Sequence, residues 1–369
     1  MPQGRRSCRF TSLSSAKTLM CVMGLFTTSG IFWLGHNLQN DNRPRQGYVK
    51  MNKNHEIAHT ASIDTGMTHV ILGLATSQTK VKQVKAGTFY DRFIRDYSGI
   101  LPEWRGFPPS RYILNCPMIC VQEQPELIVV VASAITHIER RQLIRENWGS
   151  SENKVKNKMT VVYIFGSTLD GAQQNFLQRE KAHYNDVIQL DFLDTYRNLT
   201  IKSVAMLNWL KDFCTSARFV LKADDDMLIN PDVLLSRLRH YQPKFDKFFL
   251  CAVRKGIKAV RSDDYRWHIS EKEYSDTFYP THCSGTAYAF STSAVDVLLN
   301  NTLTTPSIWI EDIYISGMLA TSIAHVHAKE FLFYHVRFQR NKCLYRKQIA
   351  MHMIPMPRRK LIYAAMRKC

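Results

Sequence analysis

The chain has 369 residues, of which 45% are hydrophobic and 11% aromatic, and it carries a formal net charge of +18 at pH 7. This hydrophobic content is that of a globular protein with a real core. The positive charge invites a nucleic-acid-binding interpretation, but the basic residues are scattered, and the chain has no arginine-rich helix and no zinc-finger or RNA-binding signature. A basic surface also suits a diphosphate or a negatively charged membrane or glycan, so charge alone does not identify the ligand.

The N-terminal residues predict a membrane anchor. Residues 1–17 contain four basic residues and no acid, and Thr18–Gly35 then continues for 18 residues without a charge. This length is at the lower limit for a helix that spans a bilayer, and the basic residues before it place the N-terminus in the cytosol. We therefore expect a cytosolic tail at 1–17, a transmembrane signal anchor at 18–35 and a lumenal remainder. A signal peptide cleaved near Ser29 and Gly30 is the alternative.

The cysteines agree with an oxidising lumenal compartment. Seven of them follow the predicted anchor: Cys116, Cys120, Cys214, Cys251, Cys283, Cys343 and Cys369. Because this number is odd, one thiol stays free or pairs between chains, and we expect it to be the terminal Cys369. The others allow several pairings, among which the sequence cannot choose. For Cys116 and Cys120 a disulfide role is favoured over zinc, since no second cysteine pair has the spacing of a zinc site.

Residues 36–122 are predicted to form a stem, because they are polar at first, lack a sustained period and end in a proline-rich stretch. From residue 123, short apolar runs alternate with segments of helical spacing. The predicted strands are Leu127–Ala132, Val161–Phe165, Val187–Phe192, Phe219–Ala223 and Phe248–Val253. The predicted helices are a capping-box helix from Thr136–Glu139 to Trp148, a helix around Gln173–His183, Leu199–Phe213 and Pro231–His240. This alternation predicts an α/β domain with a mostly parallel sheet covered on both faces.

Three consecutive carboxylates, Asp224, Asp225 and Asp226, follow the fourth predicted strand. In parallel α/β sheets, ligands bind beyond the carboxyl ends of the strands, which is where these side chains lie. Adjacent carboxylates repel one another, so a fold that keeps them together is expected to supply a cation, and oxygen ligands favour Mg²⁺ or Mn²⁺. The alternative is a solvated acidic turn.

Several motifs in the lumenal part resemble one known family. Arg141–Trp148 is similar to R-x-x-I-R-x-T-W, with Asn147 in place of Thr, Asp191–Lys202 is similar to D-F-x-D-x-Y-x-N-L-T-x-K, and Lys222–Asp226 matches K-x-D-D-D. Trp267–Ser270, Tyr279-Pro280, Ser284–Tyr288 and Glu311–Tyr314 follow in the family order. Together these motifs resemble the β-1,3-glycosyltransferases of glycosyltransferase family 31, most of all the β-1,3-galactosyltransferases, over residues 124–352.

The resemblance implies a GT-A (Rossmann-like) glycosyltransferase domain over residues 123–369, in a single-pass type II protein of the Golgi membrane. It implies Mn²⁺, a UDP-sugar donor and inverting transfer to the 3-hydroxyl of a glycan acceptor. UDP-galactose is the favoured donor. UDP-N-acetylglucosamine is the nearest alternative, and an inactive sugar-binding Golgi protein is a more distant one. The predicted lumenal location argues against a nucleic-acid partner. A homodimer is compatible with the sequence.

The resemblance also implies roles for individual acidic residues. Asp226 would bind the metal directly, Asp224 would support it or orient the nucleoside, and His352 would supply a further ligand unless it is an ordinary surface histidine. Asp312, in the pair Glu311-Asp312, would be the catalytic base, since removing the proton of the acceptor hydroxyl needs a carboxylate within reach. The alternative for this pair is stabilisation of the N-terminus of a helix over Glu311–Leu319.

Further residues complete the predicted site. The donor-binding candidates are Arg141, Arg145, Lys222, Asp224 and a more structural Asp225, although both arginines could instead pair with nearby acids. The acceptor-binding candidates are Trp267, Tyr279, Gly285 and Tyr288, with a core role as the alternative for the aromatic residues. The sequons at Asn198 and Asn300 predict glycosylation, although Asn198 could instead serve the start of its helix.

Two departures from the family pattern leave the acceptor unidentified. The family usually has E-D-V-x-x-G, whereas Glu311–Gly317 is one residue longer, so the position of the glycine is open. In addition, His268 stands where the family often has tyrosine, and Cys283 precedes Ser284.

Overall fold

The computed structural model describes residues 111–332, 342–352 and 354–368. All of them belong to the second of the two compact units into which the chain divides, Lys82–Cys369. The predicted tail at 1–17, anchor at 18–35 and most of the predicted stem lie outside the described residues. Within the described ranges, no helix is long and apolar enough to cross a membrane.

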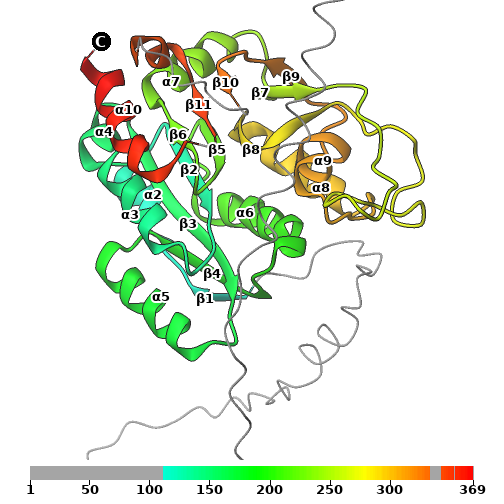
Figure 1. Cartoon of the computed structure of the whole chain (residues 1–369), viewed down its shortest axis with the longest axis horizontal. Helices are drawn as coiled ribbons and strands as arrows, with labels where there is room; N and C mark the ends of the chain where they lie inside the picture. Colours follow the sequence, from blue (N-terminus) through cyan, green and yellow to red (C-terminus); the bar gives the residue numbers. More distant parts are fainter. Residues whose placement is uncertain (1–110, 333–341, 353, 369) are drawn as a thin grey trace, which may run out of the picture. The chain divides into compact units, whose positions relative to one another are not determined.

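A mixed eight-stranded sheet forms the centre of the domain (Figure 1). Its strand order is β1 (Tyr112–Leu114), β4 (Val187–Leu193), β3 (Met159–Ser167), β2 (Leu127–Ala132), β5 (Phe219–Asp224), β8 (His282–Ser291), β7 (Phe248–Arg254) and β9 (Ala324–His327). The strands β4, β3, β2 and β5 are parallel, as predicted, and Ala132 at the end of β2 lies opposite Asp224 at the end of β5. This register puts the three aspartates at the carboxyl edge of the sheet.

The other half of the sheet differs from the prediction, because an unpredicted strand, β8, runs antiparallel between β5 and β7. The sheet is therefore mixed rather than mostly parallel. The segment Ser284–Thr286 of β8 is small and polar instead of β-branched and apolar, so it gives little strand signal in the sequence. Since Lys222 of β5 lies opposite Tyr288, β8 forms a wall beside the aspartates.

Helices cover both faces of the sheet and close two apolar cores (Figure 1). One core includes buried residues of α2 (Ile119–Glu123), α6 (Leu199–Phe213) and α8 (Val295–Thr302). The other includes residues of α3 (Ile138–Glu146), α5 (Gly171–Tyr184), α7 (Pro231–Tyr241) and α10 (Met356–Lys368). The short helix α4 (Ser151–Lys156) lies before β3. Full burial of each large apolar side chain contributes about 1.5–3 kcal/mol, so these two layers hold the sheet rigid.

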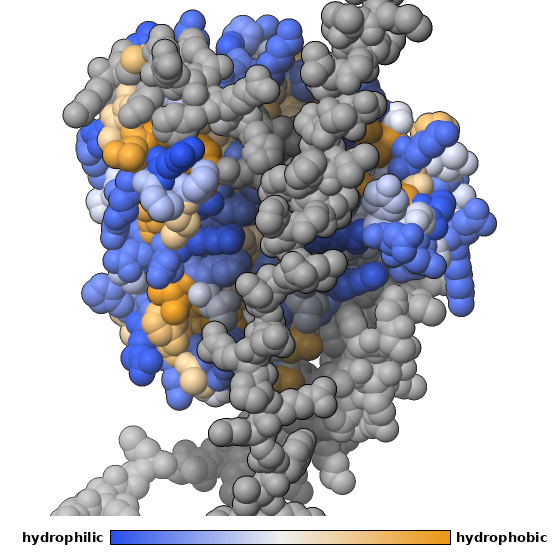
Figure 2. Space-filling view, viewed as in Figure 1, coloured by the Kyte–Doolittle hydropathy of each residue, from blue (hydrophilic) through white to orange (hydrophobic). Residues whose placement is uncertain are grey.

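The visible coloured surface is mostly polar, and apolar residues gather only in separate patches (Figure 2). This agrees with the burial of the apolar strands: all nine residues of β3 are buried, as are five of the six in β2. The hydrophobic runs that predicted these strands are thus buried in the two cores.

A small second sheet brings two predicted metal ligands together. It consists of β10 (Phe331–Leu332), β11 (Ala350–Met351) and β6 (Leu228–Ile229). β6 starts shortly after Asp226, and β11 ends directly before His352. Since Met351 pairs with Leu228, the sheet carries His352 to Asp226 although the two are far apart in sequence.

Two predicted boundaries need correction. The folded domain starts before residue 123, because β1 pairs with β4 and α2 packs into the core, so residues 112–122 are part of the domain rather than of the stem. The capping box at Thr136–Glu139 does not form either. α3 starts one residue after His137, whose side chain makes no capping bond.

The disulfides also differ from one expectation. Cys120 is bonded to Cys214 and Cys251 to Cys283, and Cys343 is disulfide-bonded as well. Among the described cysteines, the free thiol is Cys116, which is buried in the core, so the disulfide role expected of Cys116 is wrong. Cys369 itself lies outside the described residues.

Candidate active site

A buried lysine organises the end of β5. Lys222 is 3% exposed, and its Nζ donates hydrogen bonds to Asp224 Oδ1 at 2.8 Å and to the carbonyl of Gly285 in β8 at 2.7 Å. Burial alone would lower the pKa of Lys222, but the charges of Asp224 and Glu311 raise it above its ordinary value. A permanently charged lysine therefore lies between the aspartate motif and the second predicted acidic pair.

Glu311 is the anchored member of that second pair. It opens the short helix α9 (Glu311–Ile313) and is 6% exposed. Its Oε1 accepts hydrogen bonds from Ser203 Oγ at 2.7 Å and from Tyr288 Oη at 2.5 Å, and its Oε2 lies 3.5 Å from Lys222 Nζ. These contacts fix the position of the Glu311 carboxylate below the site.

Asp312, the second member of the pair, has a shifted pKa. Burial, followed by the adjacent charge of Glu311, raises the pKa of Asp312 to about 7, although Lys222 opposes the shift. Burial likewise raises the pKa of Asp224 to about 6. A carboxylate whose pKa lies near neutrality can exchange a proton with a ligand at physiological pH, which is the property required of a general base.

The extra residue in Glu311–Gly317 has a structural explanation. Residues Tyr314–Met318 form a π-helical turn, in which the Leu319 amide donates to the Tyr314 carbonyl at 2.9 Å. A π turn accommodates one more residue than an α turn. The added residue is therefore absorbed after the acidic pair, and the position of Asp312 at the helix start is kept.

A cavity of about 210 Å³ opens over these groups. It is lined by Tyr196, Leu199, Lys222, Asp224, Trp267, Ser284, Gly285, Thr286, Trp309, Ile310, Glu311 and Asp312. Trp309 Nε1 and Thr286 Oγ1 are buried and have no hydrogen-bond partner among the described residues. Since buried donors normally have a partner, their presence in the cavity wall indicates a polar ligand.

The four predicted acceptor residues divide into two groups. Trp267 and Gly285 line the cavity, and Trp267 is 52% exposed. Tyr288 is fully buried and holds Glu311, so it supports the site from below. Tyr279 is 5% exposed and packs against Tyr274 in the core, which favours the alternative core role for these two tyrosines.

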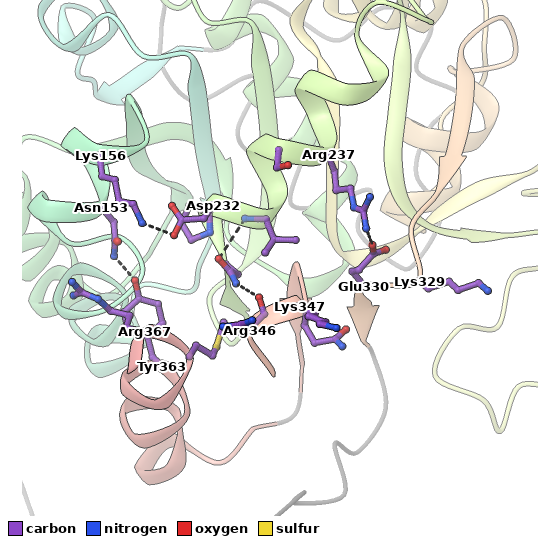
Figure 3. Close-up of a pocket in the computed structure, with 16 residues that line it drawn as sticks. Asn153, Lys156, Asp232, Arg237, Lys329, Glu330, Arg346, Lys347, Tyr363 and Arg367 are labelled. Carbon is purple, nitrogen blue, oxygen red and sulfur yellow. Dashed lines mark hydrogen bonds and ion pairs between the residues drawn. The ribbon is translucent and has the colours of Figure 1, made fainter. Parts of the chain in front are cut away.

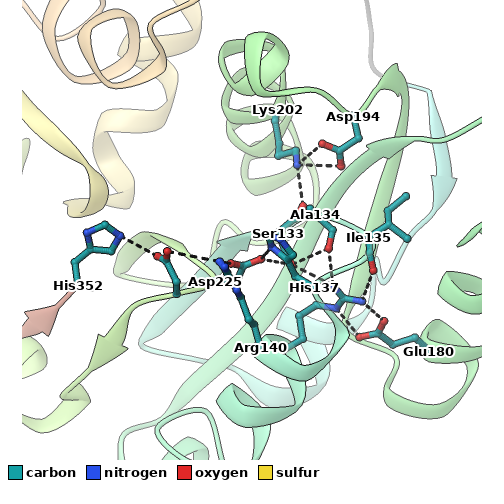
Figure 4. Close-up of polar contacts among 12 residues, drawn as sticks. Ser133, Ala134, Ile135, His137, Arg140, Glu180, Asp194, Lys202, Asp225 and His352 are labelled. Atoms are coloured by element: carbon teal, nitrogen blue, oxygen red, sulfur yellow. Dashed lines mark hydrogen bonds and ion pairs between the residues drawn. The ribbon is translucent and has the colours of Figure 1, made fainter. Parts of the chain in front are cut away.

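The middle aspartate is held by a network of polar side chains (Figure 4). Asp225 is 4% exposed and accepts hydrogen bonds from Ser133 Oγ at 2.7 Å and Arg140 Nη1 at 2.8 Å, while His137 Nδ1 lies 2.8 Å from its Oδ2. All three partners belong to the loop after β2 and the start of α3. Asp225 thus fixes this loop at the edge of the sheet, in agreement with its expected structural part.

The last aspartate faces His352. Asp226 Oδ1 lies 3.3 Å from His352 Nε2 and is buried without a hydrogen-bond donor among the described side chains. Arg140 Nη1 is 3.5 Å from the other oxygen. In the part of the chain that is described, no group of three or more His, Cys, Asp or Glu residues is arranged to hold a metal ion. The predicted metal ligands Asp224, Asp226 and His352 therefore do not form one such group.

Both predicted donor-binding arginines pair with acids instead. Arg141 is 0% exposed, and all five of its N–H groups are used: two bind Glu180, one Ser133 and two the carbonyls of Ala134 and Ile135 (Figure 4). Arg145 forms two hydrogen bonds with Asp186 and a salt bridge with Glu180. Arg141 has no donor left for a ligand, so it acts by fixing the loop after β2.

The two predicted glycosylation sites have different surroundings. Asn198 is 1% exposed, and its side-chain nitrogen donates to the Leu193 carbonyl at 2.7 Å. Its side chain does not cap α6, so neither suggested role of Asn198 matches this contact. Asn300 is exposed near the end of α8, where a glycan meets no such obstacle.

A larger hollow, of about 1040 Å³, has no unpaired carboxylate that could act as a base among the described residues that line it (Figure 3). It lies beside α7 and α10 and is lined by six cationic residues and two carboxylates. The carboxylates are already paired, Asp232 with Lys156 at 2.6 Å and Glu330 with Arg237 at 2.5 Å. The smaller cavity at Asp312 is therefore the candidate active site.

The sequence did not predict several members of the site. Ser203 lies inside α6 and meets Glu311 across the fold, and Tyr196 faces the cavity from the turn Tyr196–Asn198. Ser133 and His137 gain their importance from the contact with Asp225. Tyr196 belongs to the motif over Asp191–Lys202, but no role followed from that position. The contacts of Ser203, Ser133 and His137 join distant segments, so no local pattern in the sequence could have revealed them.

Comparisons with known proteins find relatives of this chain. A family model described as Galactosyltransferase matches residues 139–330. Beta-1,3-galactosyltransferase 2 of Homo sapiens is 32% identical over 255 residues, which cover 67% of this chain and 60% of that protein. Beta-1,3-galactosyltransferase 1 of Mus musculus is 30% identical over 246 residues, which cover 66% of this chain and 74% of that protein. The match thus spans less than two thirds of the first relative.

Among solved structures, the apo form of the bifunctional glycosyltransferase WbbM aligns with a TM-score of 0.36 and 13% identity, covering 63% of this chain and 46% of that chain.

Proposed function

Because the chain belongs to the galactosyltransferase family, we propose that it transfers galactose from UDP-galactose to the 3-hydroxyl of an acceptor sugar, in β linkage and with inversion. The observation that carries this proposal is the cavity over Asp312. There a carboxylate with a pKa of about 7 meets two partnerless buried donors and an exposed indole. This combination suits a hydroxyl-rich ligand that must lose one proton.

The reaction is a single displacement at the anomeric carbon. Asp312 accepts the proton of the acceptor hydroxyl while the hydroxyl oxygen forms a bond to the anomeric carbon. The bond between this carbon and the diphosphate breaks on the opposite face, and the diphosphate leaves with the electron pair of that bond. A base near neutrality is strong enough to take this proton and is still largely ionised above pH 7.

The neighbours of Asp312 keep it in place and set its basicity. Glu311 raises the pKa of Asp312 by its charge, and it is itself held by Ser203, Tyr288 and Lys222. Gly285 leaves the space for the Asp312 carboxylate, because a Cβ there would lie 3.0 Å from its Cβ and Oδ2. We assign positioning roles to Glu311, Lys222 and Tyr288.

The donor diphosphate is expected to bind with Mn²⁺ at Asp226 and His352. The fit is supported by the buried Asp226 Oδ1, which lacks a hydrogen-bond donor among the described residues and faces an imidazole nitrogen at 3.3 Å. Such cations commonly use one or two protein ligands together with substrate phosphates. A bound cation would neutralise the charge that develops on the leaving diphosphate. Asp224 supports the same end of the site through its bond to Lys222.

The cellular setting is part of the proposal. The uncharged run at Thr18–Gly35 and the disulfides of the domain support a type II protein of the Golgi membrane with a lumenal catalytic domain. The acceptor would then be a glycan of a glycoprotein, glycolipid or proteoglycan.

The test is a donor screen with the full-length chain, using UDP-galactose, UDP-N-acetylglucosamine and UDP-N-acetylgalactosamine with a panel of β-glycosides. We expect galactose transfer that requires Mn²⁺ and is lost in Asp226→Ala. Transfer of N-acetylglucosamine instead would change the donor but keep the mechanism. Absence of transfer with every UDP-sugar would contradict the proposed function.

A further inference from the structure

Two arginines stack on aromatic residues of the cavity wall. The guanidinium of Arg197 lies 4.2 Å from the ring centroid of Trp309, and that of Arg266 lies 4.1 Å from the ring centroid of Tyr196. Tyr196 and Trp309 are neighbours, with centroids 6.2 Å apart, and both line the cavity. The two cations thus contact two aromatic residues of the cavity wall, although neither arginine lines the cavity itself.

This wall is fixed by contacts across the fold. Trp267 Nε1 donates to Tyr196 Oη at 3.1 Å, which ties the loop of Trp267 to the turn of Tyr196. Thr200 Oγ1 donates to the Ile308 carbonyl at 2.7 Å, which ties the start of α6 to the segment of Trp309. The aromatic residues therefore form a rigid platform, and the arginines that stack on them are preorganised.

Both arginines are exposed, and within the described ranges neither forms a salt bridge or a hydrogen bond. A guanidinium that stacks on an aromatic ring keeps its edge free to bind a carboxylate, sulfate or phosphate with two parallel hydrogen bonds. The buried Trp309 Nε1, which also lacks a partner in the described structure, adds a donor on the same platform.

The position of the pair separates it from the donor end. Asp226, His352 and Arg140, where we place the diphosphate, do not line the cavity, whereas Tyr196 and Trp309 do. An anion bound by Arg197 and Arg266 would therefore belong to the sugar that enters over the aromatic wall.

We propose that the acceptor is an acidic glycan, in which a carboxylate or sulfate close to the accepting sugar is bound by Arg197 and Arg266. The proposal rests on the proposed function, because it takes the cavity at Asp312 as the acceptor site. It assigns specificity rather than chemistry to the two arginines, which discriminate charged acceptors from neutral ones.

The experiment compares three probes that share a terminal β-galactose. The neutral probe is a galactosyl-glucose glycoside. The carboxylate probe has glucuronate in place of glucose, and the sulfate probe is the galactosyl-glucose glycoside with a 6-sulfate on its galactose. The full-length chain is tested for galactose transfer and, by calorimetry, for equilibrium binding of each probe. We expect kcat/KM for one anionic probe to exceed that for the neutral probe by about tenfold or more, as for hydrogen bonds to a charged group. Which anionic probe is preferred distinguishes a carboxylate from a sulfate.

Variants then test whether Arg197 and Arg266 cause the preference for the anionic probe. In Arg197→Ala/Arg266→Ala the ratio should fall to about one through a higher KM for the anionic probe, with transfer to the neutral probe unchanged. The single change Arg197→Lys should give an intermediate ratio, because lysine keeps the charge but not the planar fork. Arg179→Ala removes an exposed arginine of α5 that does not line the cavity, and it should keep the full ratio.

The outcomes separate the two proposals. Transfer to all probes with equal kcat/KM would overturn the acidic-acceptor inference and leave the proposed function standing. Absence of transfer, combined with tighter binding of an anionic probe that depends on Arg197 and Arg266, would overturn the proposed function and support the anion site. A preference that survives the double variant would contradict the inference.

Discussion

Gly285 and Asp312 lie in direct contact: a Cβ at Gly285 would come within 3.0 Å of both the Cβ and the Oδ2 of Asp312. Gly285 belongs to β8, and its carbonyl also accepts a hydrogen bond from Lys222. The glycine thus lets the strand approach the acidic pair closely enough for both to share one lysine. Neither residue has a positive φ, so glycine is required at position 285 because a larger side chain would not fit.

Gly285→Ala should reduce kcat by about tenfold or more with little loss of stability. The added methyl group forces the Asp312 carboxylate to move by a few tenths of an ångström, and small displacements of catalytic groups are costly. The matched control is Gly171→Ala at the start of α5, where an added Cβ meets nothing within 4 Å. Steady-state kinetics and thermal unfolding of both variants test this. Full activity in Gly285→Ala would show that Asp312 does not need its observed position.

Tyr288→Phe should move the pH dependence of kcat to higher pH. Tyr288 donates a hydrogen bond to Glu311, so its removal leaves more negative charge beside Asp312 and raises the pKa of Asp312 further above 7. A shift of about half to one pH unit corresponds to the loss of one hydrogen bond, which also costs about 1 kcal/mol of stability.

The control for Tyr288→Phe is Tyr314→Phe, which removes the hydrogen bond from Tyr314 to the Thr305 carbonyl. It should cost similar stability without moving the pH profile, because Tyr314 Oη does not bind Glu311. Equal profiles in wild type and Tyr288→Phe would contradict the electrostatic link between Glu311 and Asp312.

Arg141→Lys should destabilise the domain by about 3 kcal/mol, because lysine cannot satisfy the five contacts of the buried guanidinium and leaves Glu180 incompletely paired. Arg239→Lys, at an exposed pair with Glu126, should cost less than about 1 kcal/mol. Chemical denaturation measures both. If Arg141 bound the donor instead, its replacement would raise the KM for UDP-galactose without this loss of stability.

Asn300→Gln should remove a glycan from the protein expressed in a secretory pathway, whereas Asn198→Gln should not. The Asn198 nitrogen is buried and bonded to the Leu193 carbonyl, so this change should instead lower stability by about 1 kcal/mol. Intact mass before and after removal of N-glycans distinguishes the two. A glycan on Asn198 would mean that the sequon is modified before the turn folds.

The sequence predicted those parts of the fold that have a local signal. The strand from Leu127 is a continuous apolar run, and the strand from Phe219 begins with one, Phe219–Leu221. The helix α6 matched its predicted bounds, Leu199–Phe213, because its apolar residues recur at helical spacing. β8 was missed because its small polar centre is selected by the contact with Asp312 and not by strand propensity.

The candidate site was predictable only in part. Acidic runs such as Asp224–Asp226 and Glu311-Asp312 stand out in a sequence, and both lie at the carboxyl edge of the sheet or beside it. Their partners do not stand out, because the sequence alone does not distinguish a buried, fully paired arginine such as Arg141 from an arginine that binds a ligand. Only the three-dimensional count of its five hydrogen bonds separates the two roles.

The pH dependence of kcat for galactose transfer tests the role of Asp312 as the base most directly. A base must be deprotonated to act, and burial together with Glu311 raises the pKa of Asp312 from 3.8 to about 7. We therefore predict that kcat rises with pH to a plateau with a midpoint near 7, and that Asp312→Asn lowers the plateau by at least about a hundredfold while remaining folded. A flat profile between pH 5 and 9, or an Asp312→Asn variant that retains a tenth or more of the wild-type kcat, would contradict the account.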